Sequence, residues 1–483
     1  MVRKPWLRRR EFLMTAAAPA AMAQPSPGAG RLRAGAATTN ITPNLGSSLA
    51  GNMTDYKATE VHDELHVRAL VLDNGATQLA MATCDLCVLP REVVDRAKKM
   101  VHERCGLAPS HVLVSAVHTH SAPPAAHLFQ SQADPKYLDF LVPRIADAVR
   151  LAMNHLESAR IGIGVGREDR LVFNRRYYMR PGSIPPDPFG QTTDKVKMNP
   201  GIGNPNVLGP AGPIDPDVGV MAIEALDGRP IAVWGNYALH YMGDVGGGHI
   251  SADYFGYWAR AMARLAGASS NETFPPFVAM LTNACSGNIN NIDVQKGSRT
   301  PLAPYVKMRR AAEMLAAESF RTWRGMEFTD TVALGASLEE IEFGLRLPSA
   351  EDVEKARQIL AAAPPGELKR MPEIYARETM IMAETFPKRV VAPVQAMRIG
   401  ALGIGTFPGE AFVELGLELK AKSLFRPTLV VELANDYRGY IPTLRALDEG
   451  GYETWRAKSS CLEKEAAGKI TASLVRQLGA LAA

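Results

Sequence analysis

The stretch that decides the fold is HVLVSAVHTHSAPP, residues 111–124 of a 483-residue chain. Its first half, His111–Val117, predicts a buried strand, because short apolar runs rich in valine are typical of strands inside a sheet. His118 and His120 follow directly, and an extended backbone points two residues with this spacing to the same side. The next residues, Ser-Ala-Pro-Pro, turn the chain away. We therefore expect both imidazoles at the end of a strand, where open α/β sheets bind ligands.

Strand-like and helix-like segments alternate on both sides of this stretch. Two apolar runs joined by an Asn-Gly turn, Leu65–Leu72 and Gln78–Cys84, predict a hairpin. Helical spacing marks Arg91–Cys105 and the amphipathic Tyr137–His155. Other expected strands are Arg33–Thr42, Val218–Ala225, Pro230–Tyr237, Ala396–Gly403 and Thr428–Leu433, and other expected helices are Tyr254–Ala266, Tyr305–Trp323, Ala350–Ala363 and Ala466–Leu481. This pattern predicts an α/β fold, a layered domain with mixed parallel and antiparallel central sheets flanked by helices.

Composition indicates a globular chain whose charge is concentrated at one end. Hydrophobic residues make up 46% and charged residues 22% of the sequence, as is typical of globular proteins. The formal net charge is +4, and the first 23 residues hold all of it, with five Lys or Arg against one Glu. The remainder is neutral, so we expect neither nucleic acid nor an anionic membrane as a partner.

The first 23 residues match a twin-arginine signal peptide. Arg9 and Arg10 precede a short apolar stretch, Met14–Ala23, that ends in a small-residue cleavage site. The stretch is too short to span a bilayer and Pro19 interrupts it, so we expect no transmembrane segment. An amphipathic N-terminal helix is the competing interpretation. The predicted division is a signal peptide at 1–23, a linker at 24–32 and a single catalytic domain at 33–483, in a protein that is periplasmic or secreted.

Neither the cysteines nor a long Pro/Gly-rich segment adds a chemical motif. The chain has five cysteines, and an odd number argues against a disulfide framework. Cys84 and Cys87 form a C-x-x-C, but they continue a strand-like run and no second pair exists, so we interpret both as core cysteines.

Residues 180–216 are dense in Pro and Gly and lack periodicity. A loop of this length is expected to be a lid, a binding loop or a segment without order.

His240 and Glu410 are two further candidates for a metal site. His240 follows the strand-like run Val233–Leu239, and Glu410 comes just after another strand. Two imidazoles and one carboxylate form a catalytic zinc set that leaves a coordination position for water. A carboxylate at Glu410 is equally consistent with an acid near a helix N-terminus. Spacing alone does not bring residues this distant in the sequence together.

The chain resembles the neutral, non-lysosomal ceramidase family from about Arg33 to the C-terminal helix. The most specific match is His-Thr-His-Ser after a strand, and the full set occurs in one consistent order. The matching stretches are AGA (34–36), ITP (41–43), RALV (68–71), AVHTHS (116–121), NR (174–175), IDP (214–216), His240, SAD (251–253), GNI (287–289), PGE (408–410) and NDYRGY (435–440).

The resemblance implies an exported zinc-dependent hydrolase that cleaves an N-acyl amide of a ceramide-like substrate. The residues at the family's Zn²⁺ ligands are His118, His240, Glu410 and Tyr440. His120 corresponds to a histidine beside the metal or facing the substrate, and we expect it to move protons. Tyr440 is expected to bind zinc as a phenolate or to hold a developing oxyanion. Arg175 corresponds to an arginine that contacts the polar group of the small-molecule or lipid-like substrate.

Two departures from the family bear on the substrate. Asn290 stands where ceramidases carry an essential serine, and an amide can position a substrate but cannot act as a nucleophile. The family's C-terminal β-sandwich domain is expected to be absent, because the sequence ends soon after Tyr440. Three functions stay open: amide hydrolysis in sphingolipid-like substrates, hydrolysis of a glycosidic or ester bond on the same zinc scaffold, and metal-dependent binding without turnover. The intact ligand set favours the two hydrolases.

Overall fold

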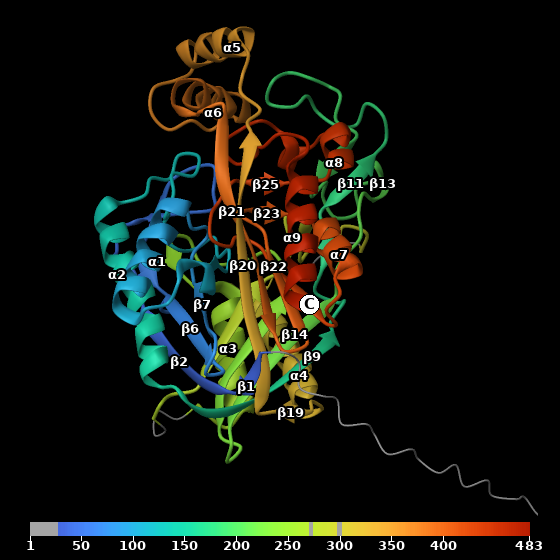
Figure 1. Ribbon diagram of the computed structural model, residues 1–483. Helices are drawn as coiled ribbons and strands as arrows, with labels where there is room; N and C mark the ends of the chain where they lie inside the picture. The colour runs from blue at the N-terminus through green and yellow to red at the C-terminus, as the bar shows by residue number, and fades with distance from the viewer. Residues whose placement is uncertain (1–27, 270–273, 297–301) are drawn as a thin grey trace, which may run out of the picture.

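The computed structural model describes residues 28–269, 274–296 and 302–483. The predicted signal peptide and the start of the predicted linker lie outside these residues. Three β surfaces enclose one inner core, and helices cover the outside of each surface (Figure 1). The predicted α/β class with mixed sheets flanked by helices is confirmed. None of the helices in the described parts of the chain has the length and apolar character needed to cross a bilayer.

The larger sheet supplies two of the three surfaces. Its strands, in pairing order, are β17 (Val278–Asn283), β15 (Pro230–Tyr237), β14 (Asp217–Ala225), β9 (Glu157–Arg167), β2 (Arg33–Asn40), β6 (His66–Asp73), β7 (Gln78–Cys84) and β8 (Val112–Ala116), with β19 (Phe328–Thr329) beside β9. The β15–β17 and β7–β8 pairs are parallel and the others antiparallel. β2 and β9 share only two paired positions, so the sheet divides there into two halves.

Each half of this sheet has its own pair of helices. The first half, with β2, β6, β7 and β8, packs its outer face against α1 (Arg91–Cys105) and α2 (Pro135–Asn154). The second half packs against α3 (Asp253–Leu265) and α4 (Val306–Arg324). Alternate residues of β6 therefore serve two cores: Ala69 and Val71 face the helices, whereas Leu70 and Leu72 face inward. Burial of each such side chain contributes about 1–3 kcal/mol.

The smaller sheet closes the inner core. Its strands, in pairing order, are β1 (Ala29–Arg31), β20 (Thr331–Gly344), β21 (Arg389–Ile399), β22 (Leu402–Thr406) and β24 (Thr428–Val431), and its helices are α7 (Val413–Lys422) and α9 (Ala466–Ala482). Two expectations differ from the structure. β1 lies inside the predicted linker, where it pairs with β20. The predicted strand Ala396–Gly403 is two antiparallel strands, because Gly400 adopts φ 59° and turns the chain.

Shorter elements border the strand ends. The pairs are β3 (Ser48–Leu49) with β4 (Tyr56–Lys57), β5 (Glu60–Val61) with β16 (His249–Ile250), β10 (Phe173–Asn174) with β18 (Ile289–Asn290), and β23 (Glu410–Ala411) with β25 (Tyr440–Ile441). A three-stranded sheet joins β12 (Val196–Met198), β11 (Arg176–Met179) and β13 (Val207–Pro210). The expected loop at 180–216 thus contains two strands, each too short to produce a detectable period. The short helix α8 (Leu444–Glu449) follows β25.

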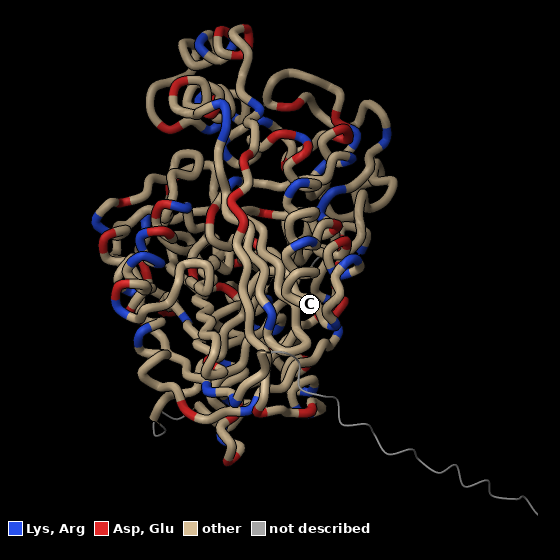
Figure 2. The backbone as a smooth tube through the Cα atoms, viewed as in Figure 1, with Lys and Arg blue, Asp and Glu red and all other residues tan. Residues whose placement is uncertain are grey.

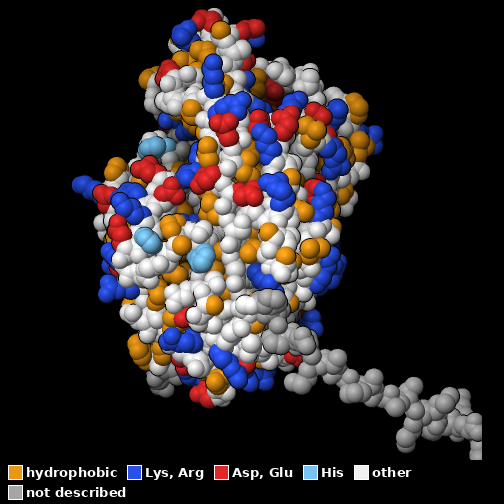
Figure 3. Space-filling view, viewed as in Figure 1, with side chains coloured by type: hydrophobic (Ala, Val, Ile, Leu, Met, Phe, Trp, Pro, Cys, Tyr) orange, Lys and Arg blue, Asp and Glu red, His pale blue; other side chains and the backbone are white. Residues whose placement is uncertain are grey.

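Helices α5 (Ala350–Ala361) and α6 (Met371–Thr385) project beyond the ends of β20 and β21 (Figure 1). We call this pair the α5–α6 extension. In Figure 2 the charged residues concentrate on outer helices and loops, while the enclosed strands carry few. On the face shown in Figure 3, Lys and Arg side chains are interspersed with Asp and Glu. This mixture agrees with the neutral charge balance after residue 23.

Candidate metal centre

The three β surfaces meet where β8, β17 and β24 end. Backbone hydrogen bonds tie these ends together: the Ala116 N–H donates to the Leu433 carbonyl at 3.1 Å, and the Glu432 N–H donates to the Asn283 carbonyl at 3.1 Å. Such bonds between strand ends leave little freedom for the residues that follow. His118 and His120 follow β8, Asn290 follows β17 and Tyr440 follows β24, so the sheets themselves set these positions.

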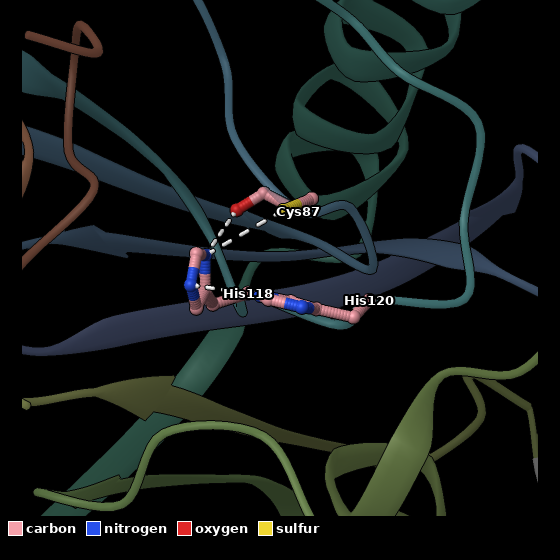
Figure 4. Close-up of side chains that lie close together, drawn as sticks. All are labelled: Cys87, His118 and His120. Atoms are coloured by element: carbon pink, nitrogen blue, oxygen red, sulfur yellow. Dashed lines mark hydrogen bonds between the residues drawn. The ribbon is translucent and has the colours of Figure 1, made fainter. Parts of the chain in front are cut away.

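The backbone at His118 differs from the expected extended strand. β8 ends at Ala116, and His118 has φ 75°, a left-handed conformation that costs a non-glycine residue about 1–2 kcal/mol. A hydrogen bond from the His118 N–H to the Leu86 carbonyl, 2.9 Å, holds the turn. The prediction of an extended backbone was therefore wrong. The imidazoles still converge, with Nε2 of His118 and Nε2 of His120 3.1 Å apart (Figure 4).

His240 and Glu410 join His118 in one buried cluster. His240 lies three residues after β15, and its Nε2 is 3.1 Å from Nε2 of His118. Oε2 of Glu410 lies 3.4 Å from Nε2 of His118 and 3.7 Å from Nε2 of His240. Glu410 belongs to β23, whose parallel pairing with β25 places it opposite Tyr440. α7 begins only three residues later, at Val413, so Glu410 also lies near a helix N-terminus, while its carboxylate oxygens lie beside the two imidazoles and Tyr437.

The hydrogen bonds of the two histidines define their tautomers. Nδ1 of His118 is 2.8 Å from the Cys87 carbonyl, and Nδ1 of His240 is 3.1 Å from the Ser286 carbonyl. A carbonyl only accepts, so both Nδ1 atoms donate, and each neutral ring keeps a lone pair on Nε2. The two lone pairs face each other, and the buried Oε2 of Glu410 accepts no hydrogen bond within the described residues. These three atoms are grouped as the donor atoms of a cation would be.

The direction of the pKa shifts agrees with that grouping. Burial lowers the pKa of His118, but Cys87 and Glu410 raise it, and the net shift is upward. Burial raises the pKa of Glu410, but His118 and Tyr440 lower it, and the net shift is downward. Both shifts favour a positive charge beside the Glu410 carboxylate. Either a proton on His118 or a bound metal cation can neutralise the negative charge of the buried Glu410 carboxylate.

Arg175 is held beside the cluster by a buried ion pair. Its Nε donates to Oε1 of Glu453 at 2.8 Å, and Arg176 donates to Oε2 of the same carboxylate at 2.9 Å. One terminal nitrogen of Arg175 lies 3.2 Å from Nε2 of His240, and the other donates to the Tyr440 hydroxyl at 3.0 Å. Arg175 and Tyr440 therefore lie beside the histidines. Glu453, which the sequence analysis did not identify, holds Arg175 in this position.

Three residues that contact the site, Tyr437, Tyr241 and Gly51, were not among the predicted site residues. The Tyr437 hydroxyl donates to Oε1 of Glu410 at 2.9 Å, and Tyr437 lies in the NDYRGY stretch that carried the resemblance. Tyr241 stacks on the His120 ring with centroids 3.6 Å apart. Gly51 has φ 99°, and a Cβ there would lie 2.3 Å from the His120 ring. A glycine is therefore required for His120 to occupy its place.

Asn290 and the cysteines lie around this centre. The Asn290 side chain donates to Asn199, which borders the large cavity described below, and Asn290 itself sits in β18. Cys84 and Cys87 are buried and free, as expected for core cysteines. Cys87 is also a neighbour of the site, because its Sγ lies 3.7 Å from Nδ1 of His118 (Figure 4).

Two cavities open onto the cluster. The small cavity, about 50 Å³, is bordered by His118, Glu410 and Tyr440 together with Glu378 and Lys458. The large cavity, about 320 Å³, is bordered by Arg175, His240 and Tyr440, and by residues of the Pro/Gly-rich segment 184–199. A molecule that spans both cavities passes the histidine–carboxylate cluster. The 180–216 segment therefore forms a wall of the site.

A buried histidine–carboxylate cluster at strand ends defines an α/β protein with a candidate metal site. The fold is that of the neutral ceramidases. The crystal structure of neutral ceramidase from Pseudomonas aeruginosa matches with a TM-score of 0.67, covering 93% of this chain and 74% of that chain at 18% identity. A ceramidase complexed with C2 matches with a TM-score of 0.69, covering 94% and 75% at 16% identity. No family model and no curated protein matches the sequence.

Proposed function

We propose that the protein is a zinc-dependent hydrolase that cleaves an N-acyl amide bond in a lipid-like substrate. The observation that carries the proposal is the buried group of three donor atoms, Nε2 of His118, Nε2 of His240 and Oε2 of Glu410, of which Oε2 accepts no hydrogen bond within the described residues. Tetrahedral zinc with ligands at 2.0–2.1 Å separates its donor atoms by about 3.3 Å. The separations here are 3.1, 3.4 and 3.7 Å. The donor set therefore fits zinc in both chemistry and spacing.

His118, His240 and Glu410 would hold the metal, and the resemblance adds Tyr440. When bound, zinc polarises a carbonyl oxygen and lowers the pKa of a coordinated water to near neutrality. The carbonyl hydrogen bonds to both Nδ1 atoms fix the orientation of the histidine rings, as partners of metal-binding histidines generally do. Tyr437 does the same for the Glu410 carboxylate through its hydrogen bond to Oε1.

Arg175 and Tyr440 would stabilise negative charge on the substrate carbonyl oxygen. The Tyr440 hydroxyl accepts a hydrogen bond from Arg175, and both side chains border the large cavity, where they would meet a substrate oxygen. His120 borders both cavities and is placed to carry a proton from the attacking water to the amide nitrogen. Water adds to the carbonyl carbon, the C–N bond breaks, and a carboxylic acid and an amine leave.

The second candidate is hydrolysis of an ester or glycosidic bond on the same scaffold. The replacement of the family serine by Asn290 favours it, because Asn290 and Asn199 form an amide pair at the wall of the large cavity where a hydroxyl is expected. Export through the twin-arginine route to the periplasm or the exterior belongs to the same proposal. Mass spectrometry of the exported protein tests it: cleavage after Ala23 is expected.

Metal analysis and a substrate panel test the proposed function. Purified protein is expected to contain about one zinc per chain, and a chelator should remove both metal and activity, with recovery on readdition of zinc. The panel pairs an N-acyl sphingosine analogue and N-acyl amino acids with esters and glycosides. A folded, active protein without metal would contradict the zinc proposal. Turnover of only esters or glycosides would replace amide hydrolysis by the second candidate.

A further inference from the structure

A third cavity, of about 250 Å³, lies against the glycine-rich segment 243–248, and we call it the glycine-loop cavity. His120 and Tyr241 border it, and the same two residues border the large cavity. Their rings stack with centroids 3.6 Å apart, so one stacked pair is common to both cavities. No step of the proposed hydrolysis uses the glycine-loop cavity.

Packing explains two of the three consecutive glycines in this segment, but not the third. A Cβ at Gly246 would lie 2.6 Å from the His249 ring. Gly248 adopts φ 73°, and an added Cβ would lie 2.7 Å from the Lys57 carbonyl. Gly247 differs, because its φ is not positive and a Cβ there would meet no atom of the described residues within 4 Å. The absence of a side chain at Gly247 therefore leaves space free at the border of the cavity.

Polar side chains with unused hydrogen-bonding capacity border the glycine-loop cavity. The Ser121 hydroxyl makes no hydrogen bond to the described residues, although Ser121 is only 8% exposed. The same holds for the more exposed Asn52 amide and Tyr56 hydroxyl. Hydroxyl and amide groups both donate and accept hydrogen bonds. They therefore match a ligand whose own groups do both, and Ser121 belongs to the His-Thr-His-Ser motif.

The charged and apolar residues around the cavity narrow the class of ligand. Among the described residues on its border none is Lys or Arg and Asp244 is acidic, so a phosphate, sulfate or carboxylate would lack a charged partner. Leu49 and Val245 are the aliphatic residues on this border, whereas Met53 and Met371 contribute to an apolar border of the large cavity. An uncharged group with several hydroxyls fits the glycine-loop cavity best.

We propose that the glycine-loop cavity binds a neutral sugar ring of an amphiphilic substrate, whose apolar chain occupies the large cavity. The ring hydroxyls would pair with Ser121, Asn52 and Tyr56. His120 borders both cavities, so it would lie where the polar and apolar parts of the substrate join, which suits a group that moves a proton. The inference goes beyond the proposed hydrolysis, and the identity of the scissile bond does not enter it.

Three octyl amphiphiles with different polar groups test the inference: octyl β-D-thioglucopyranoside, octyl triethylene glycol ether and octyltrimethylammonium. The thioglycosidic bond resists hydrolysis, so calorimetric titration of the purified protein, below the critical micelle concentrations, measures binding without turnover. The thioglucoside should bind about 10- to 100-fold more tightly than the other two, because two or three net hydrogen bonds give a factor of this size. Equal affinities would overturn the inference. Tightest binding of the ammonium compound would also overturn it, in favour of a cation beside Asp244.

Two variants locate the sugar site. Gly247→Leu fills the open space beside the loop and should reduce the thioglucoside preference to less than about threefold. Ser121→Ala removes a hydroxyl that has no partner among the described residues and should weaken thioglucoside binding by about three- to tenfold. Both should leave the affinity for the glycol ether unchanged. Because Ser121→Ala breaks no hydrogen bond of the protein, it serves if Gly247→Leu does not fold.

Gly468→Leu is the control for the larger side chain. Gly468 lies exposed on α9, away from the cavities, and a Cβ there also meets no atom of the described residues within 4 Å. This variant should keep the full thioglucoside preference. A preference that persists in both Gly247→Leu and Ser121→Ala would place the sugar elsewhere and overturn the inference.

Binding and turnover distinguish this inference from the proposed function. A thioglucoside preference without hydrolysis of any amide, ester or glycoside would overturn the proposed function and leave the sugar site standing. Hydrolysis of an amide by a protein without that preference would overturn the sugar site alone.

Discussion

Three of the proposed metal ligands, His118, Glu410 and Tyr440, border the same small cavity as Glu378 and Lys458, but different kinds of structure hold the two groups. His118 and His240 follow strands of the large sheet, and backbone hydrogen bonds fix both rings. Glu378 comes instead from the α5–α6 extension, and its Oε1 lacks a hydrogen bond. Side chains at the ends of sheet strands can move little. Side chains on the projecting helices α5 and α6 can be substituted without disturbing the metal site. Four substitutions outside the α5–α6 extension test how firmly the rest of the fold holds the metal-site side of this contrast.

The largest effect is expected at the sheet ends. His118→Ala removes a proposed ligand and should lower bound zinc to a small fraction of one per chain and kcat/KM by about 10³-fold or more. Elemental analysis and steady-state kinetics measure the two quantities. His102→Ala, an exposed histidine on α1, is the control and should change neither. Full metal content in the His118 variant would remove that residue from the ligand set.

The second-largest effect is expected at Glu453, the buried acid that pairs with Arg175. Glu453→Gln leaves the Arg175 and Arg176 guanidiniums without their shared partner, so the free energy of unfolding should fall by about 3 kcal/mol. Denaturant unfolding measures the loss. The exposed pair formed by Lys355 and Glu351 gives the comparison: Glu351→Gln should cost less than about 1 kcal/mol. Similar losses in both variants would mean that the buried pair adds no more than a surface pair.

Gly51 tests how closely the wall of the site confines His120. Gly51→Ala puts a methyl group against the His120 ring and should lower kcat by about 10- to 100-fold while zinc content stays unchanged. Gly46 also has a positive φ, 86°, but a Cβ added there would meet no atom within 4 Å. Gly46→Ala therefore reproduces the backbone strain alone and should cost about 1 kcal/mol without loss of kcat. Equal kinetics in the two variants would rule out a positional role for Gly51.

The last effect is a pH dependence of stability, which arises at Lys98 behind the sheet. Burial lowers the pKa of Lys98 on α1 to about 7, while the unfolded chain keeps the ordinary value near 10.5. Between these values the unfolded state binds the extra proton, so stability rises with pH over about 7–10.5, by about 1 kcal/mol per unit. Lys98→Met removes this slope and should stabilise the protein most at and below pH 7. Urea unfolding at several pH values measures the difference, and parallel curves would contradict the shift.

Sequence patterns located the regular elements with strong periodicity and missed those without it. The bounds predicted for β7 and α1 agree with the structure. β9 was missed although Ile161–Gly166 alternates strictly, because glycine, which fills every second position there, is uncommon in strands. β20 was missed because much of it is partly exposed on both faces. α6 was missed as well, although it supplies Glu378. Sequence periodicity reveals an element when one of its faces is buried and the other exposed, and β9, β20 and α6 do not show that clear difference.

The same limit applies to the site. The strand-end position of His118 and the ordered resemblance led to His240, Glu410, Arg175 and Tyr440, which the structure brings together. Glu453 stayed hidden, because a buried acid that pairs with two arginines looks like any charged residue in a linear sequence. The left-handed turn at His118 was hidden too, since it depends on a tertiary hydrogen bond to the Leu86 carbonyl.

The distance along the chain between His118 and Glu410, about 290 residues, has a consequence for assembly of the protein. A metal held by both residues would act as a cross-link between the first and last thirds of the polypeptide. No part of a growing chain could bind it before the final strands dock, and afterwards each bound ion would favour the folded state by mass action. Metal occupancy would then report that synthesis and folding are complete, and the loaded molecule would resist proteases longer than the empty one.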